Sequence, residues 1–471
     1  MNNHIEYYNL KKFINRKAIE IYIIVLGSLV LIYLLISLYF VNHFFLNTVI
    51  NNVNVSLKSY QDGEELLKIY PTNYELLLIE REGTTEKLNG VDIKYKFNEN
   101  NRLHIIHSAQ QSFKWVFSLF KDRNYYVKDL YSFDRKILRD RIEYLRCLQG
   151  DKILPENVRF QYLEGSYQTI KEVKGNMINI DKLETAICQS LLKGEPKLDL
   201  DKKDCYDNPR YTLISSKTAQ SKQLLNRYAS TSVTYKFGDV SEVLDGNIIN
   251  QWLTVDNNLD VEINVRFVRK YIQSLSKKYD TVGIKRNFKT SLGKVVVVNG
   301  GLYGFKINQD AEVLALIDHI CQGENIEKEP VYTQRAFARG ENEIGNTYVE
   351  INITRQYLWF YKEGKLLAQG AVVTGNPNKG NATVIGTNML NYKQKGVSLT
   401  GPGYEVGVTY WMPFYGNIGI HDATWRHSFG GTIYKRSGSH GCVNAPKYLA
   451  KIIYENIKDG IPIISYEEPQ K

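Results

Sequence analysis

Residues 418–444 read IGIHDATWRHSFGGTIYKRSGSHGCVN and bring three histidines and one cysteine into a short stretch. The apolar residues before His421 predict a strand that ends there, and a Gly-rich loop is expected over 422–438. Asn is a preferred N-cap and Pro is favoured in the first helical turn, so Asn444-Ala445-Pro446 predicts a helix that begins near 444. Cys442 is therefore expected just ahead of a helix N-terminus.

These residues form a candidate site for acyl transfer. The positive end of a helix dipole favours thiolate over thiol, so we expect a lowered pKa for Cys442, with nearby imidazole acting in the same direction. Gly441 lets the backbone approach a substrate closely, and the N–H groups of Gly441 and Cys442 would point at a developing oxyanion. With His421 as the base, a nucleophile, a base and oxyanion donors lie within 22 residues.

Other interpretations of the same residues are weaker. A zinc ion held by His421, His440 and Cys442 is disfavoured, because no fourth carboxylate and no second hydrogen-bonding partner is apparent in the sequence. His427 lies in the polar loop, where solvent exposure is expected. Trp411 and Trp425 fit either a cavity wall or the core, and the sequence does not separate these two.

The sequence around this stretch predicts a β domain. TYVEINI (347–353) alternates apolar and polar residues, which is typical of a half-buried strand, and YLWFY (357–361) and LLAQGAVVTG (366–375) follow after short turns. Strands with Gly and Asn turns continue to Ile420 and predict an all-β sandwich or partial barrel. One late helix is expected near the end, from the apolar spacing of Leu449, Ile452, Ile453 and Ile457.

Residues from about 50 to 330 contain an internal repeat. The pairs that match at one offset of 129 are Gly175 and Gly304, Asn179 and Asn308, Ala186 and Ala315, and Gly194 and Gly323. In each copy a short strand leads into a helix with Gly near its end. The amphipathic pattern over 265–279 is echoed over 138–145, and KYKF (94–97) is a weaker match to TYKF (234–237). We interpret this region as two copies of one α+β module.

Residues 21–41 carry no charge and are long enough to cross a bilayer. Lys11, Lys12, Arg16 and Lys17 precede them, so the positive-inside rule predicts a cytoplasmic N-terminus with everything after residue 42 outside. A buried core helix would seldom run so long without a polar stripe. A cleaved signal peptide stays open as an alternative, although the apolar run is long and Asn42-His43-Phe44-Phe45 is no small-residue cleavage site.

The composition bounds the class of protein. The chain has 471 residues, enough for about three domains, and 43% of them are hydrophobic, which argues against long disorder. The net charge is +10, and the basic residues are scattered without a Lys/Arg block, so no nucleic-acid partner is expected. A positive charge of this size is compatible with a polyanionic cell surface. Cys147, Cys188, Cys205 and Cys321 form no CxxC pair and are read as small buried residues, with a 188–205 disulfide left open. We expect no cofactor and no metal ion.

The pattern His421…Ser439-His440-Gly441-Cys442-Val443-Asn444 resembles the signature of the L,D-transpeptidases, whose catalytic domain is of the YkuD type. TYVEINITRQYLWFYKEGKLL (347–367) resembles the first β-hairpin of that family. GGLYGFKIN (300–308) lies in the duplicated region, which resembles the peptidoglycan-binding domain found ahead of the catalytic domain in Gram-positive members. The resemblance is strong over 345–466 and looser over 50–330.

The resemblance implies a role for each matched residue. Cys442 would be the nucleophile and His421 the base, oriented by a carbonyl just after it, while Ser439, His440 and Gly441 would shape the site and the oxyanion hole. Trp411, Asp422, Trp425 and Asn444 are candidate substrate-binding residues. Asp422 departs from the Gly or Ser of many members, which leaves the orienting contact open.

The implied reaction is the formation of 3→3 cross-links between peptidoglycan stem peptides. Cys442 would attack the third residue of a tetrapeptide donor and release D-alanine, and the amine of an acceptor stem would resolve the thioester. The alternatives are an L,D-carboxypeptidase, in which water takes the place of the acceptor, and a sortase or NlpC/P60 peptidase. Sortases and NlpC/P60 peptidases usually place the Cys before the His in the sequence or require an Arg partner, whereas here His421 precedes Cys442. A non-catalytic wall-binding protein is the remaining alternative.

The expected layout follows from these patterns. The partners are donor and acceptor stems and, through 21–41, the membrane, with the bulk of the chain on the cell-wall side; the oligomeric state stays open. The expected segments are a cytoplasmic tail (1–20), a transmembrane helix (21–41), two peptidoglycan-binding modules (50–200 and 228–330) and the catalytic domain (345–469).

Overall fold

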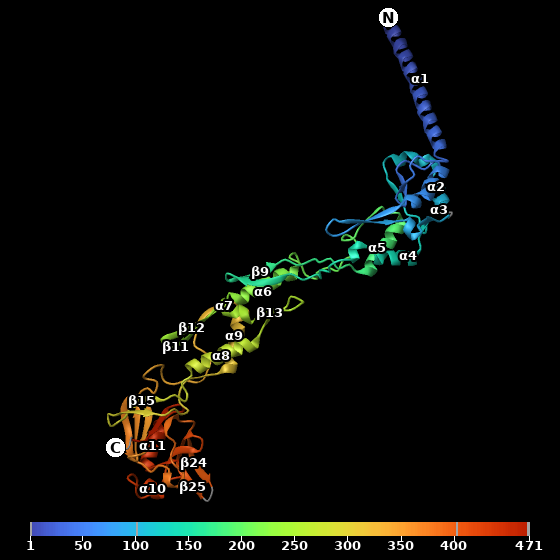
Figure 1. Ribbon diagram of the computed structural model, residues 1–471. Coiled ribbons are helices and arrows are strands. Elements are labelled where there is room, and N and C mark those ends of the chain that lie inside the picture. Colours follow the sequence, from blue (N-terminus) through green and yellow to red (C-terminus); the bar gives the residue numbers. More distant parts are fainter. Residues whose placement is uncertain (1, 100–101, 402–403, 469–471) are drawn as a thin grey trace. The chain divides into compact units, whose positions relative to one another are not determined.

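The chain divides into two units (Figure 1). The computed structural model describes residues 2–99, 102–401 and 404–468. Unit 1 contains Met1–Arg159 and Ile170–Ser215, and unit 2 contains Phe160–Thr169 and Ser216–Lys471.

An N-terminal helix, α1 (Asn2–Tyr39), begins unit 1. Its segment Arg16–Tyr39 has 24 residues and contains an 18-residue stretch with a mean hydropathy of 2.7, so its length and composition are those of a membrane span. The helix starts well before residue 21, because the polar residues ahead of the apolar run also adopt helical structure.

The remainder of unit 1 is an α+β module. Its elements are β1 (Thr48–Ile50), β2 (Val53–Asn54), α2 (Tyr60–Ile69), η1 (Tyr70–Asn73), β3 (Glu75–Ile79), β4 (Thr85–Asn89), η2 (Val91–Ile93), β5 (Lys96–Phe97), α3 (Arg102–Ser108), η3 (Ser112–Leu119), β6 (Arg123–Tyr125), β7 (Tyr131–Ser132), α4 (Arg135–Glu143), η4 (Arg146–Leu148), α5 (Ile180–Lys193) and β10 (Lys197–Asp199).

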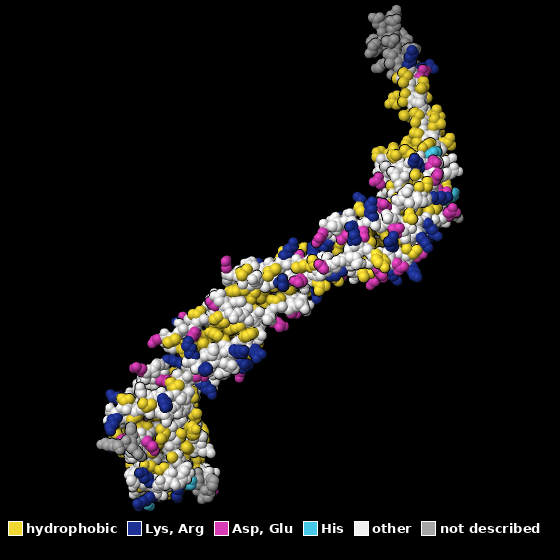
Figure 2. Space-filling model, in the orientation of Figure 1, with side chains coloured by type: hydrophobic (Ala, Val, Ile, Leu, Met, Phe, Trp, Pro, Cys, Tyr) yellow, Lys and Arg dark blue, Asp and Glu magenta, His cyan; other side chains and the backbone are white. Residues whose placement is uncertain are grey.

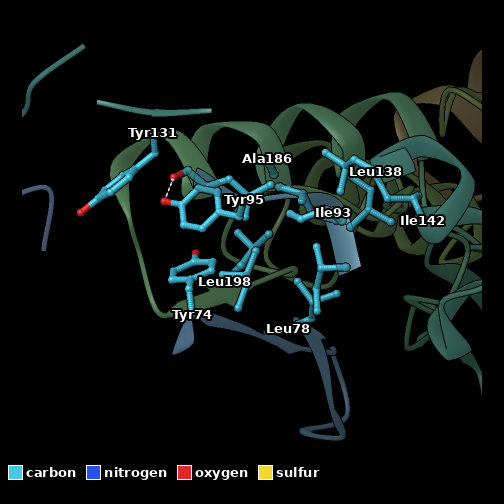
Figure 3. Packing of buried hydrophobic residues seen from close by; sticks show 14 of the residues in the cluster. Tyr74, Leu78, Ile93, Tyr95, Tyr131, Leu138, Ile142, Ala186 and Leu198 are labelled. Carbon is cyan, nitrogen blue, oxygen red and sulfur yellow. Dashed lines mark hydrogen bonds between the residues drawn. The ribbon is translucent and has the colours of Figure 1, made fainter. Parts of the chain in front are cut away.

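Aliphatic and tyrosine side chains share the core of this module (Figure 3). The ring centroid of Tyr95 lies 4.6 Å from that of Tyr74 and 5.2 Å from that of Tyr131. The buried Tyr95 hydroxyl donates to the carbonyl of Leu191 at 2.6 Å, which satisfies its polar group inside the core.

Unit 2 begins with the second α+β module. Its elements are α6 (Ser216–Ala229), β11 (Ser232–Phe237), β12 (Val240–Leu244), α7 (Gly246–Ile249), η5 (Asn250–Trp252), β13 (Leu253–Val255), β14 (Val261–Ile263), α8 (Val265–Tyr279), β15 (Arg286–Lys289), β16 (Val295–Val298), β17 (Lys306–Ile307), α9 (Gln309–Gln322), β18 (Asn325–Lys328) and β19 (Tyr332–Gln334).

The two modules share one sheet topology. Their sheets have the orders β10-β3-β4 and β18-β11-β12, and the first pair is parallel in both. Helices α5 and α9 both have 14 residues, an Asn N-cap and a left-handed Gly C-cap, at the positions that the offset of 129 relates. The match of KYKF to TYKF is wrong, because Lys96–Phe97 pairs with β7 whereas β11 corresponds to β3.

Each module also carries a hairpin at the same place between its two later helices. The first hairpin is β8 (Arg159–Leu163) and β9 (Ser166–Ile170), and its central residues belong to unit 2, where Tyr167 packs with Leu225 and Ala229 of α6. The second hairpin, β15–β16, packs Phe288 and Val298 against Ile464 and Tyr466 of the last strand.

The C-terminal domain consists mainly of two sheets, ordered β22-β21-β20-β28-β23 and β24-β25-β26-β27, and forms no closed barrel. This confirms a mostly-sheet domain with a late helix, α11, which packs Leu449, Ala450 and Ile453 into the core. The elements are β20 (Tyr348–Asn352), β21 (Tyr357–Lys362), β22 (Lys365–Ala371), η6 (Pro377–Lys379), β23 (Gly386–Met389), β24 (Gln394–Gly401), β25 (Tyr404–Tyr415), β26 (Ile418–Asp422), α10 (Ile433–Ser437), β27 (Val443–Ala445), α11 (Lys447–Asn456) and β28 (Pro462–Tyr466).

The late helix begins at Lys447 and not near 444 as expected from the Asn-Ala-Pro sequence. Asn444 lies instead in β27, beside His421 of β26, and its backbone N–H and carbonyl both bond to Val373 at 2.9 Å. Sheet pairing thus uses the backbone groups that a helix start would have required, and Pro446 becomes the N-cap. The loop expected over 422–438 contains the short helix α10.

Candidate active site

Strands β26 and β27 bring the two ends of the 418–444 stretch together. Their parallel pairing sets His421 beside Asn444, so Cys442, two residues earlier, lies on the same edge. A cavity of about 260 Å³ opens there, and it is lined by Leu399, Val406, His421, Trp425, Arg426, Gly438, Ser439, His440, Cys442 and Asn444. The cavity therefore contains Ser439, His440, Cys442, His421, Trp425 and Asn444 from the sequence prediction.

Cys442 is only partly exposed at the mouth of this cavity. Its Sγ lies 3.6 Å from the carbonyl oxygen of Asn417. Burial raises the pKa of the Cys442 thiol, and a hydrogen bond from the Gly419 backbone opposes this only in part. The expected lowering of the pKa is therefore wrong, because desolvation dominates and α11 begins only at Lys447.

His421 is buried at the end of β26, with 3% of its surface exposed. Its Nδ1 lies 2.9 Å from the carbonyl oxygen of Asp422, so Nδ1 carries the proton and donates it to that oxygen. The orienting carbonyl implied by the family resemblance is thus present, although Asp422 replaces the usual small residue. Burial lowers the pKa of His421, which keeps the imidazole neutral and its Nε2 basic near neutral pH.

Asn444 joins His421 to a basic residue that the sequence analysis did not single out. With its amide oriented to satisfy its neighbours, Asn444 Nδ2 donates to His421 Nε2 at 3.1 Å. Its Oδ1 accepts from Arg426 Nε at 2.7 Å and from Nη2 at 3.2 Å. No spacing rule marks Arg426, because its approach to Asn444 depends on how the loop after β26 folds back.

Arg426 lines the cavity together with Cys442 and His421. Burial alone lowers the pKa of its guanidinium, and no carboxylate among the described residues forms an ion pair with it. A half-buried cation with spare N–H donors in a cavity is suited to an anionic group of a ligand.

Ser439 and Gly441 form the turn that leads to Cys442. Ser439 Oγ donates to the carbonyl of Cys442 at 2.5 Å and accepts the Gly441 N–H at 3.2 Å. Contrary to the expected oxyanion hole, the Gly441 N–H is thus used within the turn. Gly441 has a φ of 118°, a conformation that other residues rarely adopt. His440 is exposed at the rim of the cavity.

Two of the candidate substrate-binding residues lie behind the cavity. Asp422 is buried, and its Oδ1 accepts the N–H groups of Thr409 at 2.8 Å and Tyr410 at 2.7 Å. Trp411 is also buried and lies 6.0 Å from the His421 ring. Trp425, in contrast, is 43% exposed, stacks 6.0 Å from the same ring and lines the cavity.

His427 and the four other cysteines do not line this cavity. His427 is exposed, as expected. Within the described residues, no group of three or more His, Cys, Asp or Glu side chains is arranged to hold a metal ion. The remaining cysteines are free thiols, so Cys188 and Cys205 form no disulfide. Burial raises the pKa of Cys147 to about 12 and that of Cys205 to about 11.

Two domain families match the chain. Residues 346–464 match the L,D-transpeptidase catalytic domain, YkuD. Residues 214–327 match the family described as "Putative peptidoglycan binding domain". No sequence among curated proteins matches the chain.

Solved structures of L,D-transpeptidases are similar to parts of the chain. A crystal structure of a mutant of the Enterococcus faecium L,D-transpeptidase is 29% identical, with a TM-score of 0.43, over 53% of this chain and 100% of that chain. The NMR structure of the E. faecium catalytic domain is 34% identical, with a TM-score of 0.24, over 26% of this chain and 97% of that chain. The same identity, coverage and TM-score hold for that domain acylated by ertapenem.

Proposed function

Since the chain belongs to the YkuD family of L,D-transpeptidases, we propose that it is a cysteine acyltransferase that forms 3→3 cross-links between peptidoglycan stem peptides. The observation that carries this proposal is the cavity shared by Cys442 and His421, in which the imidazole is held with its proton on Nδ1. A neutral thiol and a neutral imidazole that line the same cavity are the starting state for a base-assisted nucleophilic attack.

The first half of the reaction forms a thioester. His421 Nε2 gives up the hydrogen bond from Asn444 Nδ2 and accepts the proton of the Cys442 thiol, while Sγ attacks the carbonyl carbon of the third residue of a tetrapeptide donor. The tetrahedral intermediate then collapses, the bond to the terminal D-alanine breaks, and the imidazolium returns the proton to the leaving amine. The burial that lowers the pKa of His421 favours this return, because the protonated ring is the less stable form there.

The second half transfers the acyl group to an acceptor stem. The amine of a neighbouring stem attacks the thioester carbonyl, and His421 takes a proton from that amine. The bond from the carbonyl carbon to Sγ then breaks, and His421 passes the proton to Sγ, so Cys442 is released as the thiol. Trp425, which stacks on the imidazole and is 43% exposed, is positioned to contact either stem and to limit the access of water.

Arg426 supplies a positive charge that suits the donor. A stem peptide ends in a carboxylate, and a guanidinium can bind a carboxylate with two parallel hydrogen bonds. Because Asn444 occupies Nε and Nη2 of Arg426, the donors that remain at the guanidinium are available to the substrate. We assign Arg426 to the terminal carboxylate of the donor stem.

The proposed location is the outer face of the cell membrane. The basic residues before the apolar segment of α1 favour a cytoplasmic N-terminus. This topology sets the two modules and the catalytic domain on the cell-wall side, and the match of residues 214–327 to a peptidoglycan-binding family supports that location.

The function can be tested with the purified full-length protein. Incubation with tetrapeptide stems should give a 3→3 dimer by mass spectrometry together with one released D-alanine per cross-link. A carbapenem should add its mass to the wild-type protein and not to Cys442→Ala. Release of D-alanine with only tripeptide product would identify a carboxypeptidase, and turnover by Cys442→Ala would refute the proposal.

A further inference from the structure

An apolar surface lies on unit 1 next to α1. Hydrophobic side chains continue from α1 onto the adjoining end of the module in Figure 2. Five large side chains between residues 105 and 120 have exposed fractions from 46% to 87%, namely Ile105, Phe113, Phe117, Leu119 and Phe120. Large apolar groups exposed within one short segment of chain indicate a site of contact with another apolar phase or molecule. We call these five residues the 105–120 surface.

This surface is attached to α1 within the apolar segment of the helix. The Tyr33 hydroxyl donates to the carbonyl of Phe113, which lies in η3. The ring of Trp115, also in η3, lies 6.0 Å from Tyr33 and 6.2 Å from Phe40. Tyr33 precedes the end of α1 at Tyr39 by six residues, which is about 9 Å along the helix axis. The start of η3 therefore lies beside the last turns of the span and not beyond them.

A buried amide fixes this arrangement. Gln110 is 9% exposed and lies just before η3. Its Nε2 donates to the carbonyls of Phe40 at 3.1 Å and His43 at 2.6 Å, and its Oε1 accepts the Phe45 N–H at 3.3 Å. The end of α1 and the start of η3 are thus held together, so the 105–120 surface cannot turn away from the helix without breaking three hydrogen bonds.

We propose that the 105–120 surface inserts into the outer leaflet of the membrane beside α1 and holds the first module against the lipid. This inference rests on the proposed passage of α1 through the bilayer. Apolar faces of interfacial segments are buried about 5–10 Å below the headgroups, which agrees with the position of η3 along α1.

The surrounding residues suit the membrane interface. The rings of Tyr33 and Trp115 lie together and Tyr39 ends α1, and Tyr and Trp are enriched at the level of the headgroups. Lys114 is the exposed charged residue within η3, and its long side chain can reach the headgroups while its backbone stays lower. Lipid is favoured over a second copy of the chain, because a protein bound to this surface would have to displace the lipid around Tyr33.

Photo-crosslinking in lipid nanodiscs tests this inference on the full-length protein. p-Benzoylphenylalanine is introduced singly in place of Phe117, Phe120, Leu29 or Tyr144. Leu29 lies in α1 and reports on the helix alone, whereas Tyr144 is 77% exposed in unit 1 but lies outside the 105–120 surface. The replaced rings at 117 and 120 are exposed, so the larger side chain disturbs no packing.

After irradiation, intact mass identifies what each position touches. Lipid adducts are expected at Leu29, Phe117 and Phe120, and a several-fold lower yield is expected at Tyr144. Adducts at Leu29 without adducts at Phe117 and Phe120 would overturn the insertion and leave the passage of α1 through the membrane intact. A crosslinked dimer from Phe117 or Phe120 would show that a second copy covers the surface, and the absence of adducts at Leu29 would refute the placement of α1.

Discussion

The pH dependence of Cys442 acylation tests the proposed catalytic pair. Burial raises the pKa of Cys442 above its ordinary value of 9.0 and lowers that of His421 below 6.5. Between those two values both side chains are neutral, so the thiol depends on the imidazole to remove its proton. Below the lowered pKa of His421 the ring is protonated and cannot act as a base.

The expected magnitudes follow from these directions. Wild-type acylation should rise as the pH increases through the lowered pKa of His421 and then stay nearly constant until the thiol itself ionises. At about pH 7, a thiol with a pKa of about 9 is ionised to about one part in 100, and a higher pKa makes this fraction smaller. His421→Ala should therefore react about 10²–10⁴-fold more slowly near neutral pH and gain about tenfold per pH unit towards alkaline pH.

The assay is the time course of carbapenem adduct formation by intact mass, over a range from acid to alkaline pH. His427→Ala is the matched control, because His427 is an exposed histidine in the same loop. It should follow the wild-type profile, while Cys442→Ala should form no adduct. Identical profiles for the wild type and His421→Ala would show that His421 does not activate the thiol, and the role of base would then pass to His440.

Three further substitutions test the packing of a hairpin on the catalytic domain, the role of Arg426 in donor binding, and the buried hydrogen bonds of Asp422. Phe288→Ala should lower the free energy of unfolding by about 3–5 kcal/mol in a denaturant titration, because Phe288 is 5% exposed against the last strand, whereas Val297→Ala, 65% exposed in the same hairpin, should not. Arg426→Gln should lower kcat/KM for a tetrapeptide donor about 10–100-fold and change it little for a donor with an amidated C-terminus; equal losses would mean that Arg426 acts only through Asn444. Asp422→Ala removes the acceptor of two buried N–H groups and should cost about 2–5 kcal/mol in thermal unfolding, more than Asp422→Asn, and equal costs would contradict that role.

The site is only partly predictable because its members are positioned by different kinds of interaction. His421 and Cys442 stand out in the sequence, since the residue types and their order already specify a base and a nucleophile. Arg426 does not stand out, because its bond to Asn444 forms only when the loop folds back over β27. The sign of the Cys442 pKa shift was also beyond the sequence, because desolvation depends on the strands and loops that surround the sulfur.

Local signals were sufficient for several elements. Helices α5 and α9 end at Gly194 and Gly323, as the glycine near the end of each repeat predicted, because a left-handed glycine acts within one turn of the helix. The apolar segment of α1 and the existence of the strand β20 are equally local, since each depends on residues adjacent in the chain. The predicted half-burial of that strand is wrong, because Glu350 and Asn352 are fully buried together with the apolar residue between them.

Long-range pairing decided the rest. Asn444-Ala445-Pro446 carries the signals of a helix start, yet Asn444 lies in a strand because β26 and Val373 both offer partners for its backbone. In the same way, KYKF and TYKF look alike but pair with different strands. The sequence by itself determined which residues can do the chemistry and which helices can form; the tertiary structure decided which strands pair and how deeply the reactive groups are buried, because backbone hydrogen bonds and desolvation depend on residues distant in the chain.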